Sequence, residues 1–225
     1  MSADEIYRFV NLISNTVQSG RVTPDRFNLM WNRAERQLFT EKYGNPKEYK
    51  TGRPIPGQVY EQTQKISDDL RPFKTRSVVM PSSNGHIQLP PDYAHLTYLN
   101  YFKSKEEEKP IDILVDDKWA SRTSSNLIPT GKYPIANLRS DHIKVVPITT
   151  RVILGYLRYP SAVAWGYTIS GTTGRPVYDP ANSIDSEFPD ELHNDIVIKI
   201  CSYLGISLSK QELAQYTEIK NRDGI

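Results

Sequence analysis

TPDRFNLMWNRAERQLF, residues 23–39, has the clearest helical pattern near the start of the sequence. Thr23 can cap a helix, Pro24 suits the first helical position, and Asp25 suits the first turn because the backbone dipole there favours negative charge. The apolar residues recur at helical spacing: Phe27, Met30, Trp31, Ala34 and Leu38. Gly44 and Pro46 end the pattern, so we predict an amphipathic helix with one buried face.

A second amphipathic helix is predicted before this one. Ser2 and Glu5 have the spacing of a capping box, in which each side chain binds the other residue's backbone amide. The apolar residues that follow share one helix face: Ile6, Phe9, Ile13 and Val17. Gly20 can end this helix because glycine tolerates the left-handed conformation.

Helical periodicity returns near the carboxyl end of the sequence. Pro189 suits a first helical position, and Asp190 and Glu191 suit the first turn. The apolar residues of this stretch form one stripe, which Gly205 ends: Leu192, Ile196, Ile200, Tyr203 and Leu204. Two weaker helical patterns cover residues 59–70 and, after a capping box, residues 209–219.

Between these helical parts lie short β-like runs separated by turn residues, the rhythm of an antiparallel sheet or sandwich. The predicted strands are residues 77–80, 86–89, 95–102, 111–115, 135–138, 142–146, 152–159 and 164–169. Asn84-Gly85 predicts a hairpin, since both residues tolerate positive φ. Residues 170–174 read as the tip of another hairpin, and residues 116–122 as a short helix.

The sequence therefore predicts an α+β fold. Neither terminal helical part can cover its own apolar face, so we expect the two to pack together as a helical bundle with the antiparallel β domain inserted. The expected boundaries are 1–75 for the N-terminal helices and an extended arm, 76–184 for the β domain, and 185–225 for the C-terminal helices. The arm, residues 45–58, is rich in proline and glycine; it reads as a solvated loop or as an arm reaching a neighbouring subunit.

Composition narrows the class of protein. The 225 residues carry a formal net charge of +2, which argues against a surface dedicated to coating nucleic acid. The single cysteine, Cys201, excludes an intramolecular disulfide and suits a reducing compartment. The first ten residues lack the features of a secretory signal, and no stretch has the roughly 18 apolar residues of a membrane helix, so we expect no membrane partner.

A search for catalytic or metal-binding residues finds no convincing set. The four histidines lie too far apart in sequence for zinc-type spacing and read as surface or satisfied side chains: His86, His95, His142 and His193. Cys201 falls in an apolar helical pattern and reads as a buried thiol. There is no nucleophile elbow, zinc-protease motif or phosphate loop, so we predict no catalytic, metal or cofactor-binding residue.

Two clusters of residues have types that could support chemistry or nucleic-acid binding. Asp112, Asp116 and Asp117 could act as paired carboxylates, but Asp116 could equally cap the short helix that Trp119 anchors. The run 151–159 interleaves arginine and tyrosine as nucleic-acid sites do. Because both faces of that run are largely apolar, a central packed strand is the better interpretation.

Several pieces, in order along the chain, resemble the head-to-tail connector, or adaptor, proteins of tailed bacteriophages. They are TPDRFN (residues 23–28) opening a helix that contains Ala34-Glu35, LPPDY (89–93) entering a strand, LRYP (157–160), Trp165, and SEFPDELHNDIV (186–197) leading to YLGI (203–206). Each piece alone has an ordinary capping or turn explanation. Their order and the α–β–α layout carry the resemblance, which extends over most of the chain.

The resemblance implies a structural virion protein without enzymatic activity, located in the connector or neck and present in the host cytoplasm during assembly. Such proteins form a closed ring, commonly of twelve copies, that binds the portal protein and the next tail or neck ring protein. DNA passes through the lumen non-specifically, which suits a nearly neutral chain. Two alternatives stay open: a β-rich tail-associated or carbohydrate-binding module, and a divergent hydrolase that uses residues 112–117.

Overall fold

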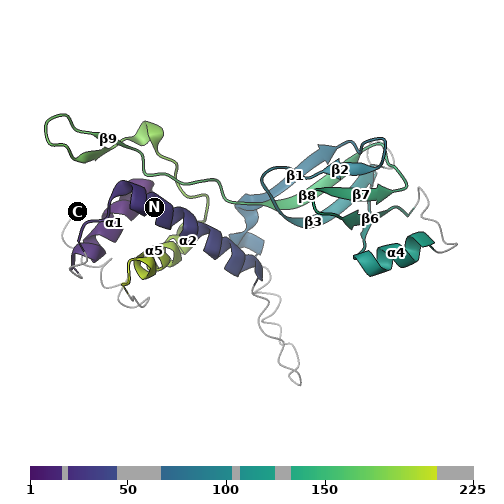
Figure 1. The fold of residues 1–225 in the computed structure, drawn as a ribbon, viewed down its shortest axis with the longest axis horizontal. Helices are drawn as coiled ribbons and strands as arrows, with labels where there is room; N and C mark the ends of the chain where they lie inside the picture. Colours follow the sequence, from purple (N-terminus) through teal and green to yellow (C-terminus); the bar gives the residue numbers. More distant parts are fainter. Residues whose placement is uncertain (17–19, 45–66, 103–106, 125–132, 207–225) are drawn as a thin grey trace, which may run out of the picture. The chain divides into compact units, whose positions relative to one another are not determined.

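The structure is a computed structural model that describes residues 1–16, 20–44, 67–102, 107–124 and 133–206. Its helices and largely antiparallel sheets confirm the predicted α+β class, with helices from both ends of the sequence flanking a β region. The chain divides into two compact units (Figure 1): a helical unit, Met1–Pro72 with Pro160–Ile225, and a β unit, Phe73–Tyr159. The described ranges contain no helix with the length and apolar character needed to cross a bilayer.

The helical unit is built from α1 (Ala3–Thr16), α2 (Pro24–Gly44) and α5 (Asp190–Tyr203). The predicted capping box begins α1: Ser2 N donates to Glu5 Oε2 at 2.9 Å, and Glu5 N donates to Ser2 Oγ at 3.3 Å. At the other terminal helix, Pro189 occupies the cap position, one residue before the position we predicted for it.

The predicted packing of N-terminal helices on the C-terminal helix is confirmed, because α5 contacts both α1 and α2. Each helix contributes its apolar stripe to the core, and all of the following are buried: Ile6, Val10, Ile13, Phe27, Trp31, Ala34, Leu38, Leu192, Ile196, Val197 and Ile200. The apolar spacing read from the sequence thus gives the correct buried faces.

The described residues of the β unit form two four-stranded sheets. One has the order β1 (Lys74–Val79), β8 (Val152–Arg158), β3 (Tyr93–Phe102), β4 (Glu108–Pro110). The other has the order β2 (His86–Gln88), β7 (His142–Val146), β6 (Ile135–Leu138), β5 (Asp112–Ile113). All pairs are antiparallel except β5 with β6, and α4 (Asp116–Ser124) follows β5.

An apolar core in the β unit draws alternate residues from both sheets, as period-two burial requires. Its members are Ile87, Leu99, Tyr101, Ile111, Ala136, Ile143, Val145, Val152, Leu154 and Tyr156. β8 is the central strand predicted for residues 152–159, paired with β1 on one side and β3 on the other. On its outer face Tyr98 lies over Gly155, where an added Cβ would come within 2.2 Å of the ring.

The predicted Asn84-Gly85 hairpin is wrong. A tight turn does form, since Ser82 N donates to His86 O at 2.9 Å and Gly85 has φ +74°. However, β1 and β2 do not pair with each other but belong to different sheets. The turn instead carries the chain from one sheet to the other. Val79 before the turn and Ile87 after it both pack against the same core, each from its own sheet.

The hairpin predicted around residues 170–174 is confirmed: β9 (Tyr167–Ile169) pairs with β10 (Pro176–Tyr178) in antiparallel register. Only the second half of the predicted strand 164–169 is regular. This hairpin clusters with the helices, so the β unit ends at Tyr159, earlier than the expected boundary at residue 184. The predicted arm, residues 45–58, the helix at 209–219 and most of the helix at 59–70 lie outside the described residues.

Candidate functional site

The connecting segment, residues 160–189, runs from the β unit to α5 and is bound to α2 by two asparagines. Asn28 Nδ2 donates to Trp165 O at 3.2 Å, and Trp165 N donates to Asn28 Oδ1 at 2.8 Å. Asn32 makes the same two bonds with Val163, at 2.8 and 3.1 Å. Each amide therefore supplies both bonds that a neighbouring β-strand residue would supply.

The spacing explains why this arrangement fits. Four residues of α-helix rise about 6 Å, and two residues of an extended chain span about 6.6 Å. Two asparagines four positions apart on one helix face can therefore pair with alternate residues along one edge of an extended segment. These bonds involve only backbone groups of the segment, so they fix its position without reading its side chains.

The Trp165 side chain supplies the specific contact. Its ring stacks on Tyr7 of α1 with centroids 4.1 Å apart, and its Nε1 donates to Asp4 Oδ1 at 3.1 Å. Tyr7 in turn meets Phe27 of α2 edge-on at 5.0 Å. Aromatic pairs at these distances add to the stabilisation from burial alone, so Trp165 anchors the connecting segment to both N-terminal helices.

The same tryptophan holds the β9–β10 hairpin. Tyr167 of β9 and Tyr178 of β10 stack on Trp165 at 5.9 and 5.8 Å. The Tyr167 hydroxyl donates to Asp25 Oδ1 at 3.0 Å, and this hydrogen bond raises the pKa of Tyr167. The hairpin is therefore attached firmly at its base.

The outer residues of the hairpin are not covered by the described chain. Ile169 is 71% exposed and Val177 is 51% exposed. Each strand pairs only with the other, which leaves the outer edges of this two-stranded sheet open within the described structure. Isolated two-stranded hairpins are marginally stable in water, and open apolar edges favour association with another chain. The hairpin thus has the properties of a protein interaction element.

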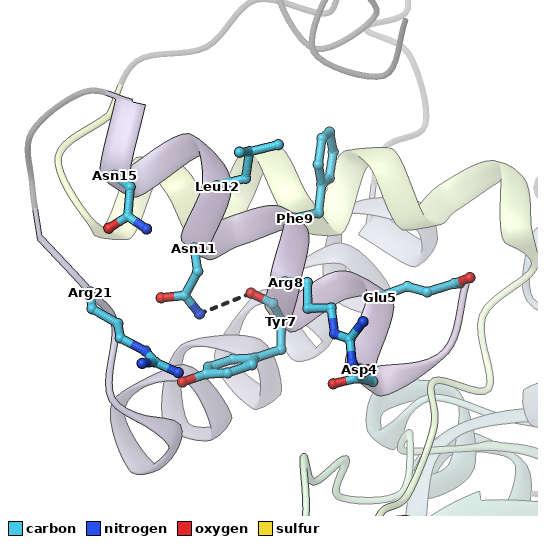
Figure 2. Close-up of a pocket in the computed structure, with 9 residues that line it drawn as sticks. All are labelled: Asp4, Glu5, Tyr7, Arg8, Phe9, Asn11, Leu12, Asn15 and Arg21. Atoms are coloured by element: carbon cyan, nitrogen blue, oxygen red, sulfur yellow. Dashed lines mark hydrogen bonds and ion pairs between the residues drawn. The ribbon is translucent and has the colours of Figure 1, made fainter. Parts of the chain in front are cut away.

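A groove of about 490 Å³ lies along α1 beside this anchor, lined in part by Tyr7, Phe9 and Leu12. Figure 2 shows Asn11 bonded to Tyr7 at the wall of this groove, with Asn15 and Arg21 among the other polar side chains that line it. Asn11 Nδ2 donates to Tyr7 O at 3.0 Å, and Asp4 pairs with Arg8 at 2.8 Å. Asn11, Asp4 and Arg8 are therefore engaged within the protein, which reduces what the groove offers for fixing the orientation of a ligand.

One buried carboxyl group stands out. Glu35 of α2 is 2% exposed, and its Oε1 has no hydrogen-bond partner within the described structure. Burial raises the pKa of Glu35 to about 7, with the Ser186 and Trp31 side chains opposing the shift and Glu187 adding to it. A buried carboxyl of this kind is stable when protonated and costly when charged.

The histidines have structural surroundings. His193 is buried, and its Nε2 lies 3.1 Å from Phe188 O. His86 and His142 stack with ring centroids 4.1 Å apart, and His142 Nδ1 lies 2.7 Å from Asp141 Oδ1. Stacked imidazoles direct their lone pairs side by side rather than at one point. Over the described ranges, no group of His, Cys, Asp and Glu side chains is placed to hold a metal ion.

The other weighed residues are likewise in structural positions. Asp116 begins α4 and accepts from Asn137 Nδ2 at 2.9 Å, which ties this helix to β6. The prediction that Cys201 is buried is confirmed, and burial raises the pKa of its thiol to about 12. In the 151–159 run, Arg151 lies over the Phe102 ring at 5.1 Å, so its guanidinium packs on the β unit itself.

Comparison with known proteins does not identify a family for this chain. No protein family model matches the chain, and no curated protein matches it significantly. Sequence reasoning placed Trp165 in the resemblance but missed the role of Asn28 and Asn32. Their spacing of four on the helix was visible in the sequence, whereas their partners lie more than 130 positions away.

Proposed function

We propose that this chain is a structural subunit of a tailed-phage head-to-tail connector, assembling as a ring between the portal and the next tail or neck protein. The proposal gives the chain no catalytic step. Two features support it: the ordered resemblance of the sequence pieces, and an α+β architecture in which the N- and C-terminal helices share one core.

The observation that carries the proposal is the firmly anchored hairpin with uncovered apolar residues. Aromatic stacking on Trp165 and the two asparagines hold its base, while Ile169 and Val177 remain exposed. Ile169 pairs with Pro176 and Val177 with Thr168, so the two exposed residues lie on opposite faces of a hairpin whose outer edges are open within the described structure. A subunit whose neighbours cover the hairpin after assembly would bury them.

The resemblance also gives DNA as a passing partner in the lumen. The formal net charge of +2 supports weak, non-specific contact, because a strongly basic lumen would retain DNA electrostatically. The virion location and the ring are part of the same proposal.

The test is the mass of the purified chain by light scattering, alone and mixed with the portal protein of the same phage. We expect a large complex in the mixture. In Ile169→Ser with Val177→Ser we expect the complex to weaken while the fold is retained, because both positions are exposed. Thr172→Ser at the hairpin tip is the matched control. Wild-type chain that stays at its free mass beside the portal would overturn the proposal.

A further inference from the structure

The solvent side of α2 carries three arginines around one leucine. Arg26, Leu29, Arg33 and Arg36 follow one another at intervals of three or four, so they share one helix face over about 15 Å. All four are exposed, and Leu29 is 73% exposed. None of these arginines forms an ion pair with another described residue. We call these four residues the arginine face.

The other sides of α2 are occupied by contacts within the protein, so the arginine face is the side of this helix that is left toward solvent. The core side of α2 is buried, and a second side binds the connecting segment through Asn28 and Asn32. The Arg33 guanidinium lies over the Tyr203 ring of α5, 5.0 Å from its centroid. Stacking of this kind reduces the freedom that the arginine would lose on binding a partner. Arg33 is therefore held in place by α5, while Arg26, Leu29 and Arg36 are exposed to solvent beside it.

The acidic end of the same unit has the opposite character. It consists of Ile184, Asp185, Asp190 and Glu191, all exposed, with Ile184 51% exposed. Asp190 Oδ1 lies 3.2 Å from His193 Nδ1 and forms an ion pair with the Met1 ammonium at 2.6 Å, and Asp185 Oδ1 accepts from Ala3 N at 2.6 Å. Glu191 follows Asp190 in the first turn of α5. The acidic end therefore carries three carboxylates and one ammonium group, which leaves a net negative charge beside an exposed stretch that includes Ile184.

We propose that the arginine face of one copy binds the acidic end of a second copy. The arginine face carries three positive charges, the acidic end carries a net negative charge, and each includes one exposed aliphatic residue, so Leu29 would pack near Ile184 with ion pairs at the rim. The two surfaces share no residue, which makes the contact heterologous: every bound copy leaves one surface of each kind free, and association continues until a ring closes. The ring rests on the proposed function; the pairing of the two surfaces does not.

Duplex DNA is the competing occupant of the arginine face. Phosphates would pair with the arginines, but they would leave Leu29 in water and give the acidic end no role. A second copy accounts for both surfaces and for both aliphatic residues. The observations therefore favour a second copy.

Charge reversal tests the pairing in the full chain. Sedimentation at low salt should show self-association that weakens as salt is raised, since salt screens exposed charges. We expect Arg33→Glu with Arg36→Glu to weaken it at least about tenfold, and Asp190→Lys with Glu191→Lys to do the same. The chain with all four substitutions should regain association. Arg139→Glu and Asp117→Lys, exposed reversals in the β unit, are the matched controls and should change little.

A cross-link provides a second readout that does not depend on charge. Leu29→Cys and Ile184→Cys chains, mixed and oxidised, should give more disulfide-linked dimer than either chain alone; the native Cys201 is buried. Failure of the four-substitution chain to regain association would overturn the pairing, as would a wild-type chain that remains a monomer at about 1 mM. Loss of duplex DNA binding without loss of self-association in the arginine variants would assign the face to DNA instead.

The same variants separate this inference from the connector proposal. Portal binding by a chain that never self-associates would contradict the pairing and leave the connector in place. Self-association that depends on both surfaces, without portal binding, would contradict the connector and leave the pairing in place.

Discussion

The β unit and the helical unit hold their chain segments by different means. In the β unit, alternate apolar residues from two sheets fill one core, and the strands pair through their own backbones. In the helical unit, a long non-helical segment is bound by asparagine side chains and a tryptophan, next to a buried carboxyl group. Apolar periodicity accounts for the first unit, whereas the second also depends on polar side chains with distant partners.

The largest expected effect comes from the helical core. Trp31 is fully buried, so Trp31→Ala should cost about 3–5 kcal/mol through lost burial and the cavity left behind. Leu154→Ala in the β-unit core is the parallel change, at about 2–5 kcal/mol. Denaturant unfolding measures both. A Trp31→Ala chain as stable as wild type would contradict the assigned helical core.

Glu35→Gln should stabilise the helical unit at high pH. Because the pKa of Glu35 in the folded chain is about 7, above its ordinary value of 4.5, the folded state binds the proton more tightly. The contribution of Glu35 to the stability of the folded state is therefore fully present below pH 4.5, and it is lost as the pH rises through 7. Glutamine carries no charge at any of these pH values, so Glu35→Gln should raise the free energy of unfolding by up to about 3 kcal/mol at pH 8 and by little at pH 4.5.

The measurement is the free energy of unfolding of both chains from pH 5 to pH 8, taken as a difference so that other titrating groups cancel. Burial lowers the pKa of His193, so that histidine favours the folded state as the pH rises, the opposite trend. A pH-independent difference between the two chains would show that Glu35 does not titrate in this range.

Asn32→Ala should cost about 2 kcal/mol, since it removes two side-chain bonds to Val163 and one to Asn28 O, each contributing roughly 0.5–1 kcal/mol. Asn32→Asp keeps the acceptor but loses the donor to the Val163 carbonyl, so it should restore only part of the stability. Asn194→Ala, at an exposed position of α5, is the control and should stay within about 0.5 kcal/mol of wild type. Equal losses of stability in Asn32→Ala and Asn194→Ala would contradict the role of the asparagine pair in binding the connecting segment.

The smallest effect is expected in the β unit at Gly155. An added Cβ would meet the Tyr98 ring, which is at the surface and can move, so Gly155→Ala should cost about 1 kcal/mol. Introducing Tyr98→Ala as well should remove most of that cost. A double-mutant cycle measures the coupling between the two positions, and additive effects would contradict the contact.

The sequence predicted those parts of the fold that follow from local spacing. The α2 stripe from Phe27 to Leu38, the Ser2–Glu5 capping box and the central strand 152–159 all have short-range signals. The hairpin at Asn84-Gly85 failed because a turn sequence fixes a local reversal but not which strands pair afterwards.

The candidate site was less predictable for a related reason. An asparagine reads as a surface, turn or capping residue, and nothing near Asn28 or Asn32 marks a partner at residues 163–165. Glu35 sits beside an apolar stripe, yet only the packing of the connecting segment shows that it is buried. The prediction that the protein acts without catalysis in a phage connector stays a proposal.

Electron microscopy of the chain mixed with its portal protein tests that proposal most directly. We expect a second ring stacked coaxially on the portal with the wild-type chain, and fewer portals that carry it with the chain that has Ile169→Ser and Val177→Ser. Portal rings with no added density, at chain concentrations well above those of the portal, would contradict it.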